Sequence, residues 1–146
     1  MRSLRTVGVI VLAVLGFFLL IQFIPYGRAH TNPAVLQEPA WDSAQTRELA
    51  QRACFDCHSN ETTWPWYSDV APISWLIQRD VEDGRRRLNF SEWNLQQRGA
   101  RNAAETVQNG SMPPWFYIPI HPAANLSAAD KAALIKGLQA TFGSGN

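Results

Sequence analysis

The pattern of apolar and polar residues separates an uncharged N-terminal run from a remainder with helical periodicity. Residues 7–24 contain no charged side chain and one polar side chain, Gln22. At about 1.5 Å per residue, a helix over this run is roughly 27 Å long, which is close to the hydrocarbon thickness of a bilayer. Arg2 and Arg5 precede the run and favour a cytoplasmic N-terminus. We predict a signal anchor, a single transmembrane helix, within residues 1–24.

A cleaved signal peptide is the alternative interpretation of this run. The run is longer than the apolar stretch of about 7 to 15 residues that is usual in signal peptides, and residues 26–29 offer no clear cleavage site. The sequence therefore favours an uncleaved anchor, and in either case the rest of the chain is exported. Residues 25–40 are punctuated by prolines and lack apolar periodicity, which predicts a linker able to extend roughly 45 Å.

Helical periodicity recurs four times in residues 41–146, and no strand pattern of any length is present. A first helix is predicted from Asp42 or Ser43 to about Ala53, with one side formed by Thr46, Leu49, Ala50 and Ala53. A second begins at Pro72, with one side formed by Ile73, Leu76, Ile77, Val81, Gly84 and Leu88.

Capping residues indicate where the later elements begin and end. Ser91 is a possible cap of a short segment, and a third helix carrying Ala103, Ala104 and Val107 ends near Asn109-Gly110. Ser127 and Asp130 have the spacing of a capping box at the start of the last helix, which is expected to bury Leu134, Ile135, Leu138 and Phe142. The predicted fold class is all-α.

Composition narrows the function classes. The net charge of +1 gives no argument for a nucleic-acid partner, and 46% of the 146 residues are hydrophobic, many of them in the N-terminal run.

The chain has two cysteines, Cys54 and Cys57, and His58 follows them directly. C-x-x-C-H is the attachment signature of c-type haem, in which both thiols add to vinyl groups of one porphyrin and the histidine binds iron. One covalently bound haem is therefore predicted.

Three other interpretations of the cysteine pair compete with haem. A thioredoxin-like dithiol needs a βαβ context, but a helical pattern precedes this motif and a Trp/Pro-rich stretch follows it. A zinc site needs four ligands, and only the isolated His30 and His121 remain. A structural disulfide across so short a loop leaves the adjacent histidine unexplained. Haem attachment is favoured over all three.

Two residues compete for the far side of the iron. Met112 lies between Gly110 and the Pro113-Pro114 pair, in a loop rather than on a packed helix face, and His121 follows nine positions later. His/Met ligation is the usual pattern of cytochromes c, so we predict Met112 as the distal ligand, with His121 and an open site as alternatives.

Longer motifs carry a family resemblance. The order of helix, C-x-x-C-H, further helices, Met-Pro loop and closing helix resembles class I cytochromes c. The chain resembles more narrowly a bacterial family of membrane-anchored haem-binding domains related to them, over about residues 41–142. The motifs that carry this resemblance are Cys54–Tyr67, Ala71-Pro-Ile-Ser-Trp75, Leu88-Asn-Phe-Ser-Glu-Trp93, Met112-Pro-Pro114 and His121-Pro122. The resemblance implies haem binding by residues 41–146 but no particular partner or reaction.

Together these features predict a membrane-tethered electron carrier rather than an enzyme. We expect it in the inner membrane, with its haem domain on the periplasmic side and with redox proteins or a larger membrane complex as partners. A haem sensor or peroxidase-like catalyst with an open sixth site is one alternative, and a structural haem module is another. Arg85, Arg86 and Arg87 are candidates for pairing with haem propionates or an acidic partner, although a solvated helix end is the simpler interpretation.

Overall fold

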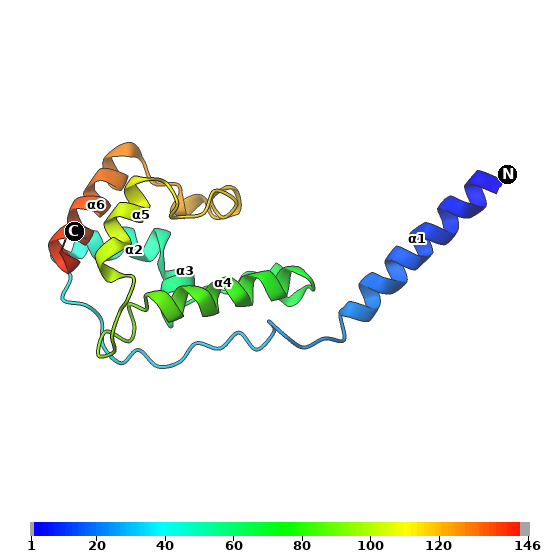
Figure 1. Ribbon diagram of the computed structural model, residues 1–146, viewed down its shortest axis with the longest axis horizontal. Coiled ribbons are helices and arrows are strands. Elements are labelled where there is room, and N and C mark those ends of the chain that lie inside the picture. The colour runs from blue at the N-terminus through cyan, green and yellow to red at the C-terminus, as the bar shows by residue number, and fades with distance from the viewer. Residues whose placement is uncertain (1, 144–146) are drawn as a thin grey trace. The chain divides into compact units, whose positions relative to one another are not determined.

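The computed structural model describes residues 2–143 and consists of helices joined by irregular segments (Figure 1). The α-helices are α1 (Arg2–Ile21), α2 (Ala44–Ala53), α3 (Phe55–His58), α4 (Ile73–Arg87), α5 (Ala103–Gln108) and α6 (Ala128–Phe142). Short 3₁₀ helices occupy Trp66–Asp69, Ala100–Asn102, Ile118–Ile120 and Pro122–Ala124. No strand occurs in residues 2–143, so the predicted all-α class is confirmed.

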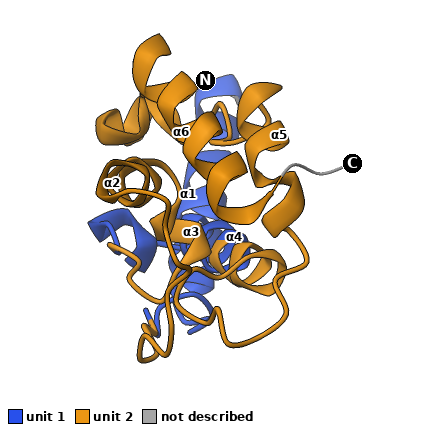
Figure 2. Ribbon diagram, turned by 90° about the vertical axis from the view of Figure 1, so that its left-hand side faces the viewer, with its two compact units in different colours: residues 1–30, 64–80 blue, residues 31–63, 81–146 orange. Residues whose placement is uncertain are grey.

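The chain forms two compact units, which are coloured separately in Figure 2. The first unit contains residues 1–30 and 64–80, and the second contains residues 31–63 and 81–146. The chain therefore alternates between the units. Helix α4 begins in the first unit and ends in the second.

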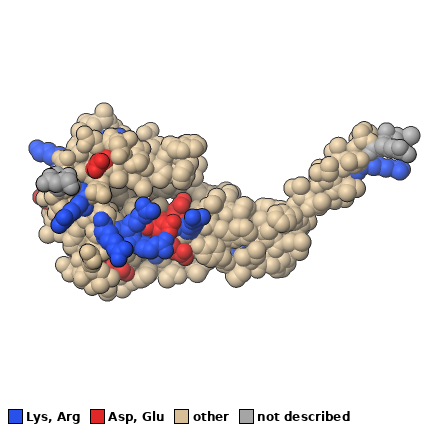
Figure 3. Space-filling view, viewed as in Figure 1, with Lys and Arg blue, Asp and Glu red and all other residues tan. Residues whose placement is uncertain are grey.

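Helix α1 is long and apolar enough over Ser3–Ile21 to cross a membrane. The charged residues of α1 are Arg2 and Arg5, and blue atoms occur near its N-terminal end in Figure 3. The helix begins earlier than the predicted run of residues 7–24 and ends three residues before that run does. The N–H groups of residues 22–24 still bond to the carbonyls of residues 19–21, so the apolar run ends in a tight turn.

The core of the second unit is built from α2, α5, α6 and the aromatic residues between them. Helix α2 begins after Ser43, whose Oγ accepts a hydrogen bond from the N–H of Thr46, and it buries the four residues predicted to form its inner side. Helix α6 begins after Ser127, which caps the N–H of Asp130 in the same way. A side chain at Gly137 would overlap that of Thr46, so the two helices approach closely there.

Three local predictions differ from the structure. Ser91 caps no helix, because residues 90–96 are non-helical, with an isolated bridge between Glu92 and Gln37, and its side chain is buried as a hydrogen-bond acceptor. Ile73 and Leu76 lie on the predicted inner side of α4 and are nevertheless exposed. The predicted linker is irregular but is not a free spacer, because the N–H groups of residues 36 and 37 bond to the carbonyl of Ser91.

Candidate functional site

The side chains of Cys54, Cys57 and His58 lie on one face of a helical turn in the second unit. Helix α2 ends at Cys54, where the backbone (φ −130°, ψ −33°) leaves helical geometry before α3 resumes at Phe55. The carbonyl of Cys54 then accepts hydrogen bonds from the N–H groups of Cys57, at 3.2 Å, and His58, at 2.9 Å. Residues at i, i+3 and i+4 of such a turn are neighbours, so both thiols and the imidazole face one side.

The His58 ring is oriented by two backbone carbonyls. Its Nδ1 lies 3.0 Å from the Leu88 oxygen and 3.2 Å from the Gly84 oxygen. Because both partners are acceptors, Nδ1 carries the proton and Nε2 keeps its lone pair. Burial lowers the pKa of His58, and the two carbonyls oppose that effect. A neutral imidazole with a bonded Nδ1–H is the usual state of a histidine that binds a metal through Nε2.

Gly84 allows α4 to reach the motif. A Cβ atom at this position would overlap the carbonyl oxygen of Cys57, so only glycine lets the helix backbone come this close. The contact brings the Gly84 carbonyl within hydrogen-bond distance of His58. Gly84 in α4 and Leu88, just beyond the end of the helix, therefore lie beside the imidazole.

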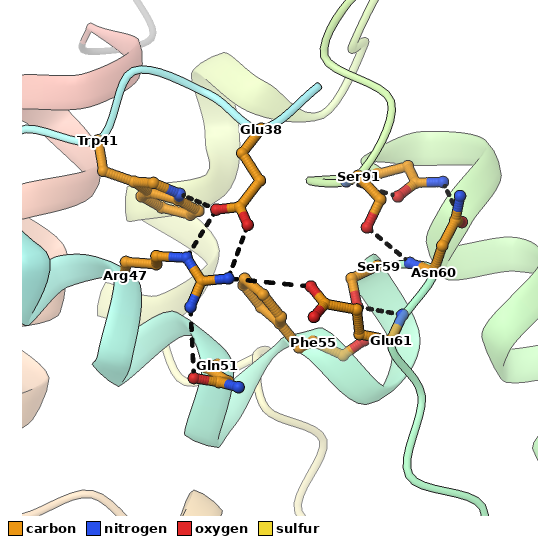
Figure 4. Close-up of polar contacts among 10 residues, drawn as sticks. Glu38, Trp41, Arg47, Gln51, Phe55, Ser59, Asn60, Glu61 and Ser91 are labelled. Atoms are coloured by element: carbon orange, nitrogen blue, oxygen red, sulfur yellow. Dashed lines mark hydrogen bonds and ion pairs between the residues drawn. The ribbon is translucent and has the colours of Figure 1, made fainter. Parts of the chain in front are cut away.

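A buried network holds the second carbonyl in place. Asn89 Nδ2 donates to Asn60 Oδ1 at 2.9 Å. The Asn60 N–H donates to Ser91 Oγ at 2.8 Å (Figure 4). Asn89 Oδ1 accepts from the N–H of Ser91 at 2.9 Å. The N–H of Phe90 donates to the carbonyl of His58 at 2.8 Å. The Leu88–Trp93 motif is thus held by hydrogen bonds to His58 and Asn60.

Aromatic packing anchors α3 through Phe55. Phe55 is buried, and its ring centroid lies 5.5 Å from that of Phe90 and 6.3 Å from that of Trp41. The Arg47 guanidinium lies 5.4 Å from the Phe55 centroid and bonds through two nitrogens to Glu38, which also accepts from Trp41 (Figure 4). Arg47 and Trp41 hold the pKa of Glu38 below its usual value.

Asp56, between the cysteines, joins the motif to two distant segments. Its Oδ1 accepts from the N–H of Thr63 at 2.9 Å, and its Oδ2 accepts from the Tyr117 hydroxyl at 2.5 Å. Burial and the Asp56 hydrogen bond raise the pKa of Tyr117. Tyr117 therefore ties the segment after α5 to the cysteine motif.

The two predicted distal ligands lie in that segment. Met112 follows Gly110, its N–H donates to the Thr106 carbonyl at 2.9 Å, and its side chain is partly exposed. His121 Nδ1 lies 3.0 Å from the Tyr117 carbonyl, and the two rings stack with centroids 3.7 Å apart. His121 is thus connected to Asp56 through Tyr117. Met112 and His121 both remain predictions for the distal ligand.

The thiols differ from those of the competing sites. Burial raises the pKa of Cys54 to about 12, and Cys57 adds to the rise. A reactive dithiol of the thioredoxin kind needs a lowered pKa, so Cys54 does not fit that interpretation. Cys54 and Cys57 are not joined in a disulfide. Residues 2–143 contain no group of three or more His, Cys, Asp and Glu side chains placed to hold a metal ion, as a zinc site requires.

Of the three arginines at the end of α4, Arg85 has a structural role. Its guanidinium donates to the carbonyls of Ser59 and Thr31 and to the side chains of Asn32 and Thr62. Arg85 is therefore not a simple solvated helix end, and pairing of these arginines with haem propionates or an acidic partner stays a prediction. Arg86 pairs with Asp83, and Arg87 is exposed.

Sequence reasoning missed the residues that support the motif, namely Gly84, Asn60, Asn89, Asp56 and Tyr117. Gly84 had a readable signal, because an isolated glycine within a helical pattern costs about 1 kcal/mol relative to alanine and needs a packing reason. The contacts of Tyr117 and Asn60 join positions 29 to 61 residues apart and have no local signature.

Comparison with known proteins bears on the same part of the chain. No curated protein and no solved structure matches the sequence. A model of the haem-binding domain family matches residues 16–140, which is well over half of the chain. This match begins inside α1 and includes the cysteine motif, Gly84, Met112 and His121. The chain therefore belongs to the haem-binding domain family.

Proposed function

We propose that this protein is a single-haem c-type cytochrome, held in the inner membrane by α1, which carries electrons on the periplasmic side. The observation that supports it most is the shared face of Cys54, Cys57 and His58, with the Nδ1 of His58 bonded to two carbonyls. Family membership independently supports haem as the ligand.

The two thiols suit covalent attachment. When bound, haem would supply two vinyl groups, and the Cys54 and Cys57 thiols are the groups that would add across them, sulfur to one vinyl carbon and hydrogen to the other, with no net oxidation or reduction. Neither cysteine is in a disulfide, and the two lie one helical turn apart, on the same side as the histidine. Phe55 is buried in the aromatic core and keeps this turn fixed while Cys54 and Cys57 hold the cofactor.

The bound haem supplies an iron that alternates between the ferric and ferrous states. His58 provides the proximal nitrogen, and its Nδ1–H bonds to Gly84 and Leu88 hold the ring and raise its basicity. We propose Met112 as the distal ligand, since a thioether raises the potential of a carrier. His121 is the alternative, because its Nδ1 is already bonded to the Tyr117 carbonyl. We further propose that the haem performs no substrate chemistry.

Acidified organic solvent tests the attachment. After the full chain has been produced with its haem and denatured, the colour should remain with the protein. In the Cys54→Ala/Cys57→Ala double variant, any haem held by His58 alone should extract completely. Haem that leaves the unmodified protein would contradict covalent attachment while leaving haem binding intact.

Absorption spectra of both redox states test the carrier role. A six-coordinate, low-spin spectrum in both states is expected, because an electron carrier keeps both axial ligands. High-spin ferric iron in the unmodified protein would instead favour the sensor or catalyst with an open sixth site.

A further inference from the structure

The first two turns of α4 carry apolar side chains that the protein does not cover. Ile73 and Leu76 are 44% and 62% exposed. Trp66, the first residue of the short 3₁₀ helix that precedes α4, is 79% exposed. Ile73 and Leu76 are three residues apart and share one face. Farther along, Val81 in the helix and Leu88, just after its last residue, are buried in the second unit. The apolar stripe of one helix is thus buried at one end and uncovered at the other.

This uncovered region is hydrogen-bonded to the end of the apolar helix α1. Gln22 Nε2 donates to the Ala71 carbonyl at 2.9 Å, and the Ala71 N–H donates to Gln22 Oε1 at 3.0 Å. Arg28 donates to the Gln22 carbonyl at 2.6 Å and to its Oε1 at 2.8 Å. Gln22, the single polar side chain of the apolar run, therefore connects α1 to the residue before Pro72.

A close backbone contact adds to this connection. Gly27 has φ +83°, and a Cβ atom there would overlap the carbonyl of Ser74 in the first turn of α4. All of these residues belong to the first unit. The position of Trp66, Ile73 and Leu76 relative to the end of α1 is therefore set by contacts within one compact unit.

Helix α1 fixes the level at which the bilayer surface must lie. Its residues 3–21 cover roughly 28 Å at about 1.5 Å per residue, so the chain leaves the hydrocarbon near Gln22. Phe23, Ile24 and Tyr26 follow and are exposed. Tryptophan, tyrosine and amphipathic helix faces are the features that gather at this depth, between headgroups and acyl chains.

We propose that Trp66, Ile73 and Leu76 insert into the boundary between lipid headgroups and acyl chains, so that the first unit is an interfacial anchor as well as a tether. This inference rests on the proposed membrane-spanning role of α1. The exposed polar side chains nearby, Asp69, Arg79 and Asp80, lie next to this apolar group in the sequence and face the headgroups and water.

Spin labels in the full chain test the proposal. Trp66→Cys and Leu76→Cys are labelled with a nitroxide in nanodiscs of phosphatidylcholine and phosphatidylglycerol. Leu12→Cys in α1 is the reference for hydrocarbon, and Gln108→Cys on the exposed side of α5 is the reference for water. Unsubstituted protein gives the blank for label on Cys54 and Cys57. The measured quantity is the ratio of the label's collision rate with oxygen to its collision rate with a water-soluble nickel complex. This ratio should be several-fold higher at positions 66 and 76 than at position 108.

Each contrary result has a distinct meaning. If the collision ratios at positions 66 and 76 equal that at position 108 while the ratio at position 12 is that of hydrocarbon, the interfacial anchor is refuted and the membrane-spanning role of α1 stands. If position 12 also matches position 108, the proposed membrane-spanning role has failed. Protection of 66 and 76 in native membranes but not in nanodiscs would assign this surface to a protein partner and overturn the lipid proposal.

Discussion

At the scale of single residues, Gly84 has the most consequences, because its missing side chain brings α4 against the cysteine motif. We expect Gly84→Ala to push the helix away from the Cys57 carbonyl and to lengthen the bond between the Gly84 carbonyl and His58. Overpacking of this kind costs about 1–3 kcal/mol. Thermal unfolding should shift to lower temperature, and haem content per chain should fall.

Gly16→Ala is the matched control for that variant. Gly16 lies within α1, and a Cβ atom there meets nothing within 4 Å. Its haem content and unfolding temperature should equal those of the unmodified protein. Equal haem content and stability in Gly84→Ala would show that the close approach is not needed.

The distal ligand is also a question about single residues. Met112→Ala should convert low-spin ferric iron to high-spin iron or lower the reduction potential, because the thioether raises the potential relative to a second histidine. His121→Ala should leave the ligation intact and serves as the control. Absorption spectra and redox titration of both variants provide the measurement. The opposite pattern would assign the sixth position to His121.

At the scale of elements, hydrogen bonds hold the Leu88–Trp93 segment against the residues that follow the cysteine motif. We expect Asn89→Ala to leave Asn60 Oδ1 and the Ser91 N–H without their buried partner, at a cost of about 1–3 kcal/mol. Thermal unfolding should detect the loss. Asn94→Ala, at an exposed position of the following turn, should change little. Equal effects of the two variants would rule out the network as a source of stability.

The segment before α2 is held by a pH-sensitive pair. The hydrogen bonds from Arg47 lower the pKa of Glu38 below its usual value of 4.5. The folded state then binds the Glu38 proton less readily than the unfolded state, so the pair stabilises the fold fully above about pH 4.5. This contribution disappears as the pH falls through the lowered pKa.

Glu38→Gln tests that pair. The variant should be less stable than the unmodified protein by about 1 kcal/mol at neutral pH. The difference should vanish in acid, as measured by thermal unfolding across the pH range. The exposed Glu48→Gln on α2 is the control and should show no such pH-dependent difference. A Glu38→Gln difference that persists in acid would exclude the carboxylate as its source.

An element could be predicted from the sequence when the contacts that fix it join residues close together in the chain. Ser43 and Ser127 cap helices through bonds to N–H groups three residues away, so a local pattern suffices. Ser91 has the same residue type, but its bond to Asn60 spans 31 positions and overrides the local preference. The periodicity of α4 gave its extent but not the exposure of its first half, because periodicity does not say what covers a face.

At the scale of the whole molecule, the N-terminal helix decides whether the protein stays in the membrane. We expect purified protein to retain residues 1–29, because the apolar run exceeds a signal peptide's length and no clear cleavage site follows it. N-terminal sequencing and intact mass measure this directly. A mature N-terminus beyond Ala29 would replace the anchor with a cleaved signal, and the predicted haem attachment would be unaffected.

The candidate site was predictable in its reactive residues and not in their supports. The spacing of Cys54, Cys57 and His58 is itself the signal, since the chemistry requires those residues close together in sequence. The carbonyls of Gly84 and Leu88 are 26 and 30 residues from His58. Because every residue type has the same main-chain carbonyl, the sequence does not reveal which residues supply these acceptors. The alternation of the chain between two units likewise arises from contacts between distant segments.

The use of main-chain carbonyls to hold His58 has a consequence for how members of this family diverge. A side-chain acceptor would have to be inherited, whereas every amino acid supplies the same carbonyl oxygen. Position 88 can therefore change among apolar residues without loss of its bond to the imidazole. Position 84 lacks that freedom, since its own Cβ would displace the helix. Across relatives, a glycine 26 residues after the histidine should therefore persist while most of the surrounding helix drifts.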